Sequence, residues 1–215
     1  MCSSDLNLGS KLLNSFVVAS ATVLIAMPLA LCSAYAFSRF DFALKQPLFF
    51  AIIASQFIPA AVVVLPYFLM FKQLGWLDTR SALVLVNLSI VLPYAVWMIK
   101  GFIDAVPVEM EESAMVDGAS RLRVLWEMVV PVALPGVITA AVFSFTLTWN
   151  EFLFALILTK QDALTLPIGL IGFRTERGDL WELMASAGMI ITLPMVLISL
   201  AVHKRSEERR VGKEC

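Results

Sequence analysis

The chain has 215 residues, of which 60% are hydrophobic and only 15% are charged, and its mean hydropathy is +0.85. A soluble domain carries about 25% charged residues because its surface must be hydrated, so this composition predicts a protein whose solvent is largely lipid. The formal net charge of −1, with no basic face or tail, gives no reason to expect a nucleic-acid partner.

The two ends of the chain are interpreted as foreign to it. Segments 1–6 and 205–215 back-translate to the two ends of a common short-read sequencing adapter. We therefore expect both to be sequencing artefacts and exclude them from the fold, which leaves residues 7–204 as one domain. The alternative for the second segment is a genuine basic cytoplasmic tail. With the ends excluded, Cys32 remains as a lone cysteine, which gives no disulfide framework.

Apolar segments long enough to cross a membrane recur along the chain. A helix needs about 20 mostly apolar residues to cross about 30 Å of hydrocarbon. Five segments meet this length, at about 12–37, 48–71, 82–99, 136–158 and 185–202. Because a lone strand would leave its backbone unpaired in lipid, the predicted fold class is all-α, a polytopic transmembrane helical bundle.

Prolines inside these segments are interpreted as kinks, because neighbouring groups in a bundle can satisfy the freed carbonyls. They are Pro59 and Pro66 in the second segment, Pro93 in the third and Pro194 in the fifth. Kinked helices often line a transport pathway, but the packing of the helices against one another explains these kinks equally well. Lysine and arginine divide six to six between the two sides of the membrane, so the positive-inside rule does not give the orientation.

The connector between the third and fourth segments, at about 103–135, is long and charged. Glu109, Glu111 and Glu112 suit the start of a helix, and Gly118 suits its end. A second amphipathic helix is predicted from Leu122, closed by Pro131 and Pro135 before the next span. Two short helices of this kind either lie flat on the membrane interface or dock in a groove on a partner, and residue patterns leave both open.

Residues Trp149, Asn150 and Glu151 form a polar and aromatic group inside the predicted fourth span. Glu151 would lie roughly 22 Å along that helix from Gly136. A carboxylate at that depth is expected to face the bundle interior or a wet cavity, where the three residues could meet a sugar. A structural hydrogen bond between spans is the alternative. His203, at the end of the last span, is expected to have no special role.

The connector resembles the cytoplasmic loop of permease subunits from binding-protein-dependent ABC importers. That loop reads Glu-Ala-Ala, three residues, Gly, nine residues, then Ile-x-Leu-Pro, and this chain keeps the spacing throughout. Ser113, Met128 and Val130 replace the first alanine, the isoleucine and the leucine. The loop residues implied to couple to an ATPase are Glu112, Ser113, Ala114, Asp117, Gly118, Met128, Val130 and Pro131.

The resemblance extends to most of residues 12–204 and favours the carbohydrate-importer branch. Residues 14–42, with Ala34-Tyr35-Ala36 followed by Ser38-Arg39-Phe40, are similar to the second span of that branch. Residues 149–158 are similar to its fifth span, and residues 164–170 to the outer loop that follows. Because the branch has six spans in the type I importer fold, the resemblance implies that the first span is missing here and that the Glu112 loop is cytoplasmic.

What the resemblance implies is half of a carbohydrate channel with no catalytic residues, cofactor or metal of its own. The expected partners are a second permease subunit, ABC ATPase subunits, a periplasmic or extracellular solute-binding protein, the sugar and membrane lipid of the bacterial inner membrane. No glycine-rich phosphate loop occurs in the sequence, so ATP hydrolysis is expected on another chain. The alternative function is an ion-coupled secondary transporter subunit.

Overall fold

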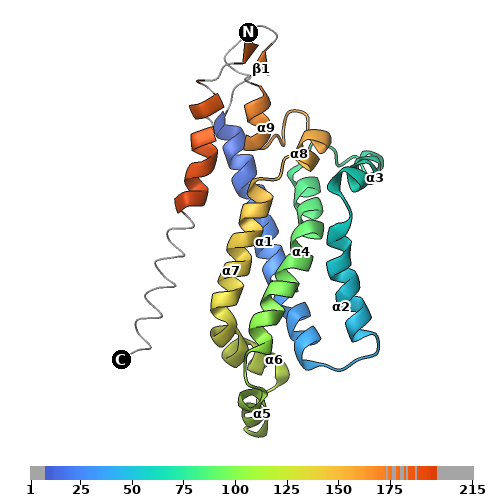
Figure 1. Ribbon diagram of the computed structural model, residues 1–215, viewed down its shortest axis with the longest axis vertical. Helices are drawn as coiled ribbons and strands as arrows, with labels where there is room; N and C mark the ends of the chain where they lie inside the picture. The colour runs from blue at the N-terminus through green and yellow to red at the C-terminus, as the bar shows by residue number, and fades with distance from the viewer. Residues whose placement is uncertain are drawn as a thin grey trace. The chain divides into compact units, whose positions relative to one another are not determined.

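The computed structural model describes residues 8–172, 174–175, 178–179, 182, 184–186 and 188–197. The described chain is almost entirely helical, which confirms the predicted all-α class, and Figure 1 shows its elements coloured in chain order. The longer helices are α1 Leu8–Arg39, α3 Ala60–Gln73, α4 Arg80–Asp104 and α7 Val130–Trp149. The shorter ones are α2 Lys45–Ala54, α5 Val108–Val116, α6 Arg121–Val124, α8 Leu153–Leu158 and α9 Leu166–Ile171.

Four elements of the described chain are not α-helical, and a further helix carries no label. Ser55–Phe57 is a 3₁₀ turn and Leu125–Val129 is a π-helical stretch. Strands β1 Arg174–Thr175 and β2 Gly178–Asp179 pair antiparallel in the segment after α9, a detail that the sequence did not predict. An apolar helix follows at Met184–Leu197, and both adapter-like ends and His203 lie outside the described residues.

Among the described residues, three helices are by themselves long and apolar enough to span a membrane: Leu8–Arg39, Arg80–Asp104 and Arg121–Trp149. The bent pair Lys45–Phe57 and Ala60–Gln73 makes a fourth if it counts as one broken span. These correspond to the first four predicted spans. The fifth is described only as far as Leu197.

Pro59 breaks the second predicted span, so its interpretation as a kink was wrong. The ring of a proline disfavours the helical conformation of the residue before it. Ile58 accordingly adopts an extended backbone, with φ −74° and ψ 119°, and α3 begins just after Pro59. Pro66 and Pro93, by contrast, lie inside continuous helices, as predicted.

The fourth predicted span has the wrong boundaries at both ends. Helical structure begins at Arg121 and continues through Pro131 and Pro135, which therefore do not close the second loop helix. A proline has no N–H to donate to the carbonyl four residues earlier in an α-helix. The π-helical stretch before Pro131 has a different hydrogen-bond pattern, so the helix continues past this proline. At its other end α7 stops at Trp149, so Glu151 lies beyond the span rather than within it.

The chain forms two compact units, and each has its own buried cluster. Of the described residues, the first unit comprises 8–22, 59–87 and those from 145 onward, and the second comprises 23–58 and 88–144. In the second unit, the core contains two small residues of α1 that lie four positions apart, Ala30 and Ala34. They pack with Ile99, Val129 and Ala133. Small side chains let helix backbones approach closely, which is how helices associate in lipid.

Several large apolar side chains on the spanning helices face outward. Leu24 is 73% exposed and Trp97 is 57% exposed, although each lies in the middle of an apolar helix. In water such residues would be buried, whereas lipid tails are as apolar as the side chains themselves. The outward apolar residues therefore fit a membrane protein.

Candidate functional site

Helix α5 ends at the predicted glycine in a well-formed Schellman motif. Ala119 N donates to Ala114 O at 3.0 Å, and Gly118 N donates to Met115 O at 3.1 Å. Gly118 has φ +88°, a conformation that residues with a Cβ rarely adopt. The sequence prediction that the helix ends at Gly118 is confirmed.

Ser120 caps the N-terminus of the second loop helix, α6, because its Oγ accepts a hydrogen bond from Arg123 N at 3.4 Å. This is the usual role of serine at a helix N-terminus. Helix α5 contacts α6 and the π-helical stretch, and Figure 1 shows α5 beside α6. The connector is therefore a helix-turn-helix, as the sequence predicted.

The apolar side chains of the two loop helices are divided between the core and the surface. Leu125 and Val129 are buried in the core, whereas Leu122 and Trp126 are exposed. On α5, Ala114 and Met115 pack against that core, while Met110 is exposed. The large apolar side chains exposed on the loop are Val108, Met110, Val116, Leu122, Trp126 and Val132.

The predicted coupling residues lie on this loop at different depths. Four of them are exposed on α5 and its turn: Glu112, Ser113, Asp117 and Gly118. Ser113 Oγ donates to Met110 O at 3.0 Å. The remaining four are half-buried or at the start of α7: Ala114, Met128 and Val130 are half-buried, and Pro131 is exposed.

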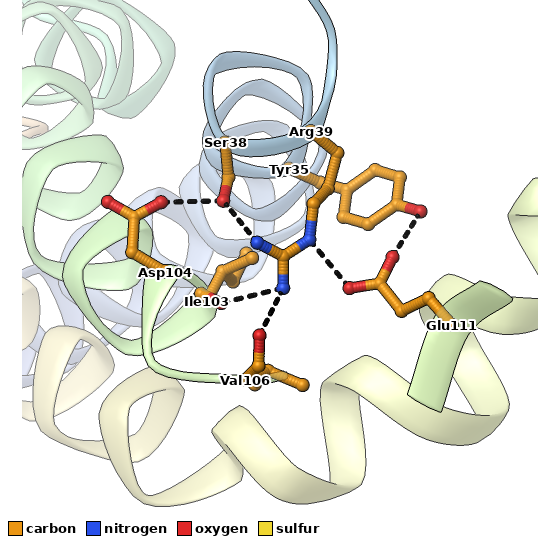
Figure 2. Close-up of polar contacts among 7 residues, drawn as sticks. All are labelled: Tyr35, Ser38, Arg39, Ile103, Asp104, Val106 and Glu111. Atoms are coloured by element: carbon orange, nitrogen blue, oxygen red, sulfur yellow. Dashed lines mark hydrogen bonds and ion pairs between the residues drawn. The ribbon is translucent and has the colours of Figure 1, made fainter. Parts of the chain in front are cut away.

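Glu111, next to the motif glutamate, is buried and fully engaged. Its side chain is 3% exposed, and its Oε1 accepts a hydrogen bond from Arg39 Nε at 2.6 Å. Its Oε2 accepts one from the Tyr35 hydroxyl at 2.9 Å. Figure 2 shows both donors, one helical turn apart on α1, directed at the same carboxylate. Glu109 and Glu112, on the same short helix, are exposed.

The Arg39 guanidinium binds more than the carboxylate. Its Nη2 donates to Ile103 O at 3.0 Å and to Val106 O at 2.7 Å, and its Nη1 donates to Ser38 Oγ at 3.2 Å. Figure 2 shows the side chain lying between these groups. One residue therefore joins the end of α1, the last turn of α4, the α4–α5 connector and α5 itself.

A second acid extends this network toward the solvent. Ser38 Oγ donates to Asp104 Oδ1 at 2.6 Å (Figure 2), and Lys100 Nζ bonds Asp104 Oδ2 at 2.6 Å one turn away on α4. Asp104 is partly exposed, so this pair contributes less than a buried one would.

Sequence reasoning missed the Arg39–Glu111 pair. The sequence patterns assign Arg39 no partner and place Glu111 among three helix-start acids. The available signal was the spacing of Tyr35 and Arg39, which places two hydrogen-bond donors on one helix face. Nothing in the sequence shows which of three clustered glutamates they meet.

In the other unit, Asp78 organises the segment after α8. Its Oδ1 accepts backbone hydrogen bonds from Lys160 and Ala163 at 3.0 and 3.1 Å. Its Oδ2 accepts from Gln161 and Asp162 at 3.0 and 3.1 Å. Burial alone would raise the pKa of the Asp78 carboxyl, but these four N–H donors together hold its pKa below the ordinary value.

Asn14 holds the same segment from α1. Its Nδ2 donates to Asp162 O and to Leu164 O, both at 2.9 Å, and its Oδ1 accepts from Arg80 Nε at 2.8 Å. Ser15 Oγ accepts from Leu166 N at 2.8 Å, where α9 begins. Backbone and side-chain bonds therefore secure the segment at both of its ends.

The three predicted pathway residues are placed together, but in different environments. Trp149 is buried, stacks on Phe145, and donates from Nε1 to Ile191 O at 3.1 Å. Glu151 accepts from Phe154 N at 2.7 Å and from Ala155 N at 3.0 Å, so it caps the N-terminus of α8. Asn150 is exposed, and its Nδ2 donates to Thr146 O.

The chain is similar to the members of one known protein family. Residues 21–212 match the family model of the binding-protein-dependent transport system inner membrane component. A putative ABC transporter permease protein of Streptomyces antibioticus, ORF1, is 37% identical over 90% of this chain and 85% of its own length. The trehalose/maltose transport system permease protein MalG of Thermococcus litoralis is 31% identical over 93% of this chain and 72% of its own.

A solved structure shares the fold. It is a bacterial ABC transporter involved in the import of the acidic polysaccharide alginate, with a TM-score of 0.79 at 19% identity. The similarity covers 94% of this chain and 76% of the other. The described helices therefore follow the type I importer permease fold.

Proposed function

The chain belongs to the family of binding-protein-dependent transport system inner membrane components, and we propose that this ABC importer permease subunit forms half of a carbohydrate pathway driven by a separate ATPase. The observation that carries the proposal is the loop between α4 and α7. Its turn presents exposed acids beside exposed apolar side chains, with the family's spacing of Glu112 and Gly118.

The loop has the features of a helix that docks in a groove on a partner. Such a helix offers apolar anchors ringed by polar groups. Met110, Val116 and Leu122 are the exposed anchors, and Glu112 and Asp117 supply the charged rim. The coupling face consists of Glu112, Ser113, Ala114, Asp117 and Gly118, and Met128, Val130 and Pro131 join it to the spanning helix. Since the sequence has no phosphate-binding loop, the partner supplies the nucleotide site.

The proposed cargo is a carbohydrate or a closely related polyol. This rests on similarity to a trehalose/maltose permease and on the branch-specific residues 34–40. Trp149, Asn150 and Glu151 are proposed to form one wall of the pathway, in which Asn150 faces the substrate. Asn150 offers the exposed polar group, while Trp149 and Glu151 set its position through their own bonds.

The remaining partners follow from the same assignment. The outward apolar residues of α1 and α4 contact lipid or a second permease subunit in the bacterial inner membrane. The segment 159–166, held by Asp78 and Asn14, provides an ordered surface for a solute-binding protein on the outer side. No described feature favours the ion-coupled alternative: the buried Arg39–Glu111 pair lies where α1 ends, not midway along a span.

Glu112→Lys in the full-length gene product tests the docking proposal. The residue is exposed, so the variant should fold and insert normally but offer the ATPase the opposite charge. We expect loss of ATPase co-purification from detergent-solubilised membranes. Glu109→Lys, an equally exposed acid on the same helix, is the control and should retain the ATPase. Normal co-purification with Glu112→Lys would contradict the proposal.

Gly118→Asp tests whether the turn itself matters. A Cβ at Gly118 meets no atom within 4 Å, so the substitution strains the turn only through φ +88°, at a cost on the order of 1 kcal/mol. We expect the strained turn to weaken association with the ATPase. Gly118→Asn should recover part of the ATPase association, because asparagine tolerates left-handed backbone better than other residues do. Gly75→Asp is the matched control, since Gly75 has φ +68° and equally open surroundings in a different connector. Equal loss in the two aspartate variants would mean that the turn has no specific role.

A further inference from the structure

Helix α5 has few means of keeping a defined orientation. It has nine residues, whereas isolated helices shorter than about 12 residues are marginal in water. Its packing rests on Ala114 and Met115, which are only half-buried. Glu111 is the buried residue of this helix, and its partners lie on α1.

Arg39 ties α5 to the ends of two spanning helices. Besides Glu111, it binds the carbonyl oxygens of Ile103, in the last turn of α4, and Val106, in the connector (Figure 2). Carbonyls at a helix C-terminus have no partner within the helix, and a cation there also suits the helix dipole. The planar guanidinium gives these bonds fixed relative directions, which a lysine ammonium would not.

Stability alone does not explain an ion pair at this place. Desolvating two charges offsets much of their attraction, and apolar replacements of a buried pair are often neutral or stabilising. What the pair does provide is a defined geometry between α5 and α1. The exposed pair Lys45–Asp41 in the next connector imposes no such geometry, because Asp41 is fully exposed.

We propose that Arg39, through Glu111, is a positioning residue that makes α5 move as one piece with the ends of α1 and α4. The proposal rests on the proposed function of the loop and deepens it. The coupling face docks on the ATPase, and the Arg39–Glu111 pair passes its displacement to the spanning helices. Tyr35 restricts the glutamate to one orientation.

The test uses the full-length gene product assembled with its partner permease, ATPase and solute-binding protein in proteoliposomes. The double variant Arg39→Met, Glu111→Leu replaces the buried pair with apolar groups. We expect normal assembly and ATP hydrolysis, but sugar transported per ATP hydrolysed should fall about fivefold or more, the lower end of coupling between distant sites. Glu111→Gln, which keeps the shape and one acceptor oxygen, should show a smaller fall in the same ratio. The control Asp41→Asn, Lys45→Gln should leave it unchanged.

Two results would overturn the inference. An unchanged ratio in the assembled double variant would make the pair a structural contact only. If the double variant does not assemble, the Glu111→Gln variant is the test instead. If its amount of sugar transported per ATP hydrolysed equals that of the wild type, the pair again has only a structural role. These results are distinct from one that contradicts the proposed function itself. That result would be normal ATPase co-purification with the Glu112→Lys variant, in which Arg39 is unchanged.

Discussion

Two acidic side chains, Glu111 and Asp78, organise the connectors by different means. Glu111 receives its hydrogen bonds from the side chains of Arg39 and Tyr35, so substitution of either donor changes what holds α5. Asp78 receives four bonds from the backbone of residues 160–163. Its role therefore depends on its own charge and shape rather than on the identity of the residues it binds.

Asp78→Asn should loosen the segment that follows α8. The asparagine oxygen can replace one carboxylate oxygen, but its NH₂ group then faces two backbone N–H donors. We expect a loss of about 1–2 kcal/mol, moderated by partial exposure, measured as a lower melting temperature in detergent. Asp41→Asn, which changes a fully exposed acid, should have no effect.

The effect of Asp78→Asn on stability is expected to depend on pH. Because the folded-state pKa of Asp78 is lowered, its contribution is complete above the ordinary aspartate pKa of about 3.9 and is lost as the pH falls below it. The difference in melting temperature between wild type and Asp78→Asn should therefore be constant near neutral pH and shrink below about pH 4. A difference that persists unchanged in acid would show that the carboxylate charge is not responsible.

At the scale of elements, sequence patterns predicted which segments are helical better than where the helices end. Long apolar runs in lipid can only be helices, so α1 and α4 were found. The break at Pro59 and the continuation through Pro131 were not, because a proline's effect depends on the hydrogen-bond pattern around it. The Gly118 turn was predicted since its chemistry is local, whereas the Arg39–Glu111 pair joins residues 72 positions apart.

The packing of α4 on α7 depends on a glycine. A Cβ at Gly136 would overlap the ring of Phe102, which leaves no room for a side chain without movement. Gly136→Ala should therefore destabilise the protein by about 1–3 kcal/mol, the usual range for overpacking. Gly101→Ala on α4, where a Cβ meets nothing within 4 Å, is the control and should be neutral or slightly stabilising.

Adding Phe102→Ala, which removes the overlapping ring atoms Cγ and Cδ2, to Gly136→Ala distinguishes this contact from a general intolerance of α7 to alanine. If the ring causes the strain, the two substitutions should not be additive, and the double variant should melt above Gly136→Ala alone. Additive losses would place the cause elsewhere.

For the whole molecule, the central claim is that this permease subunit moves a carbohydrate only when a separate ATPase drives it. The direct measurement is ATP hydrolysis in proteoliposomes that contain the full-length gene product, its partner permease and its ATPase subunits. We predict that sugar-loaded solute-binding protein stimulates hydrolysis and that omitting the ATPase abolishes uptake. Sugar uptake by the permease alone, driven by an ion gradient and indifferent to ATP, would contradict the account.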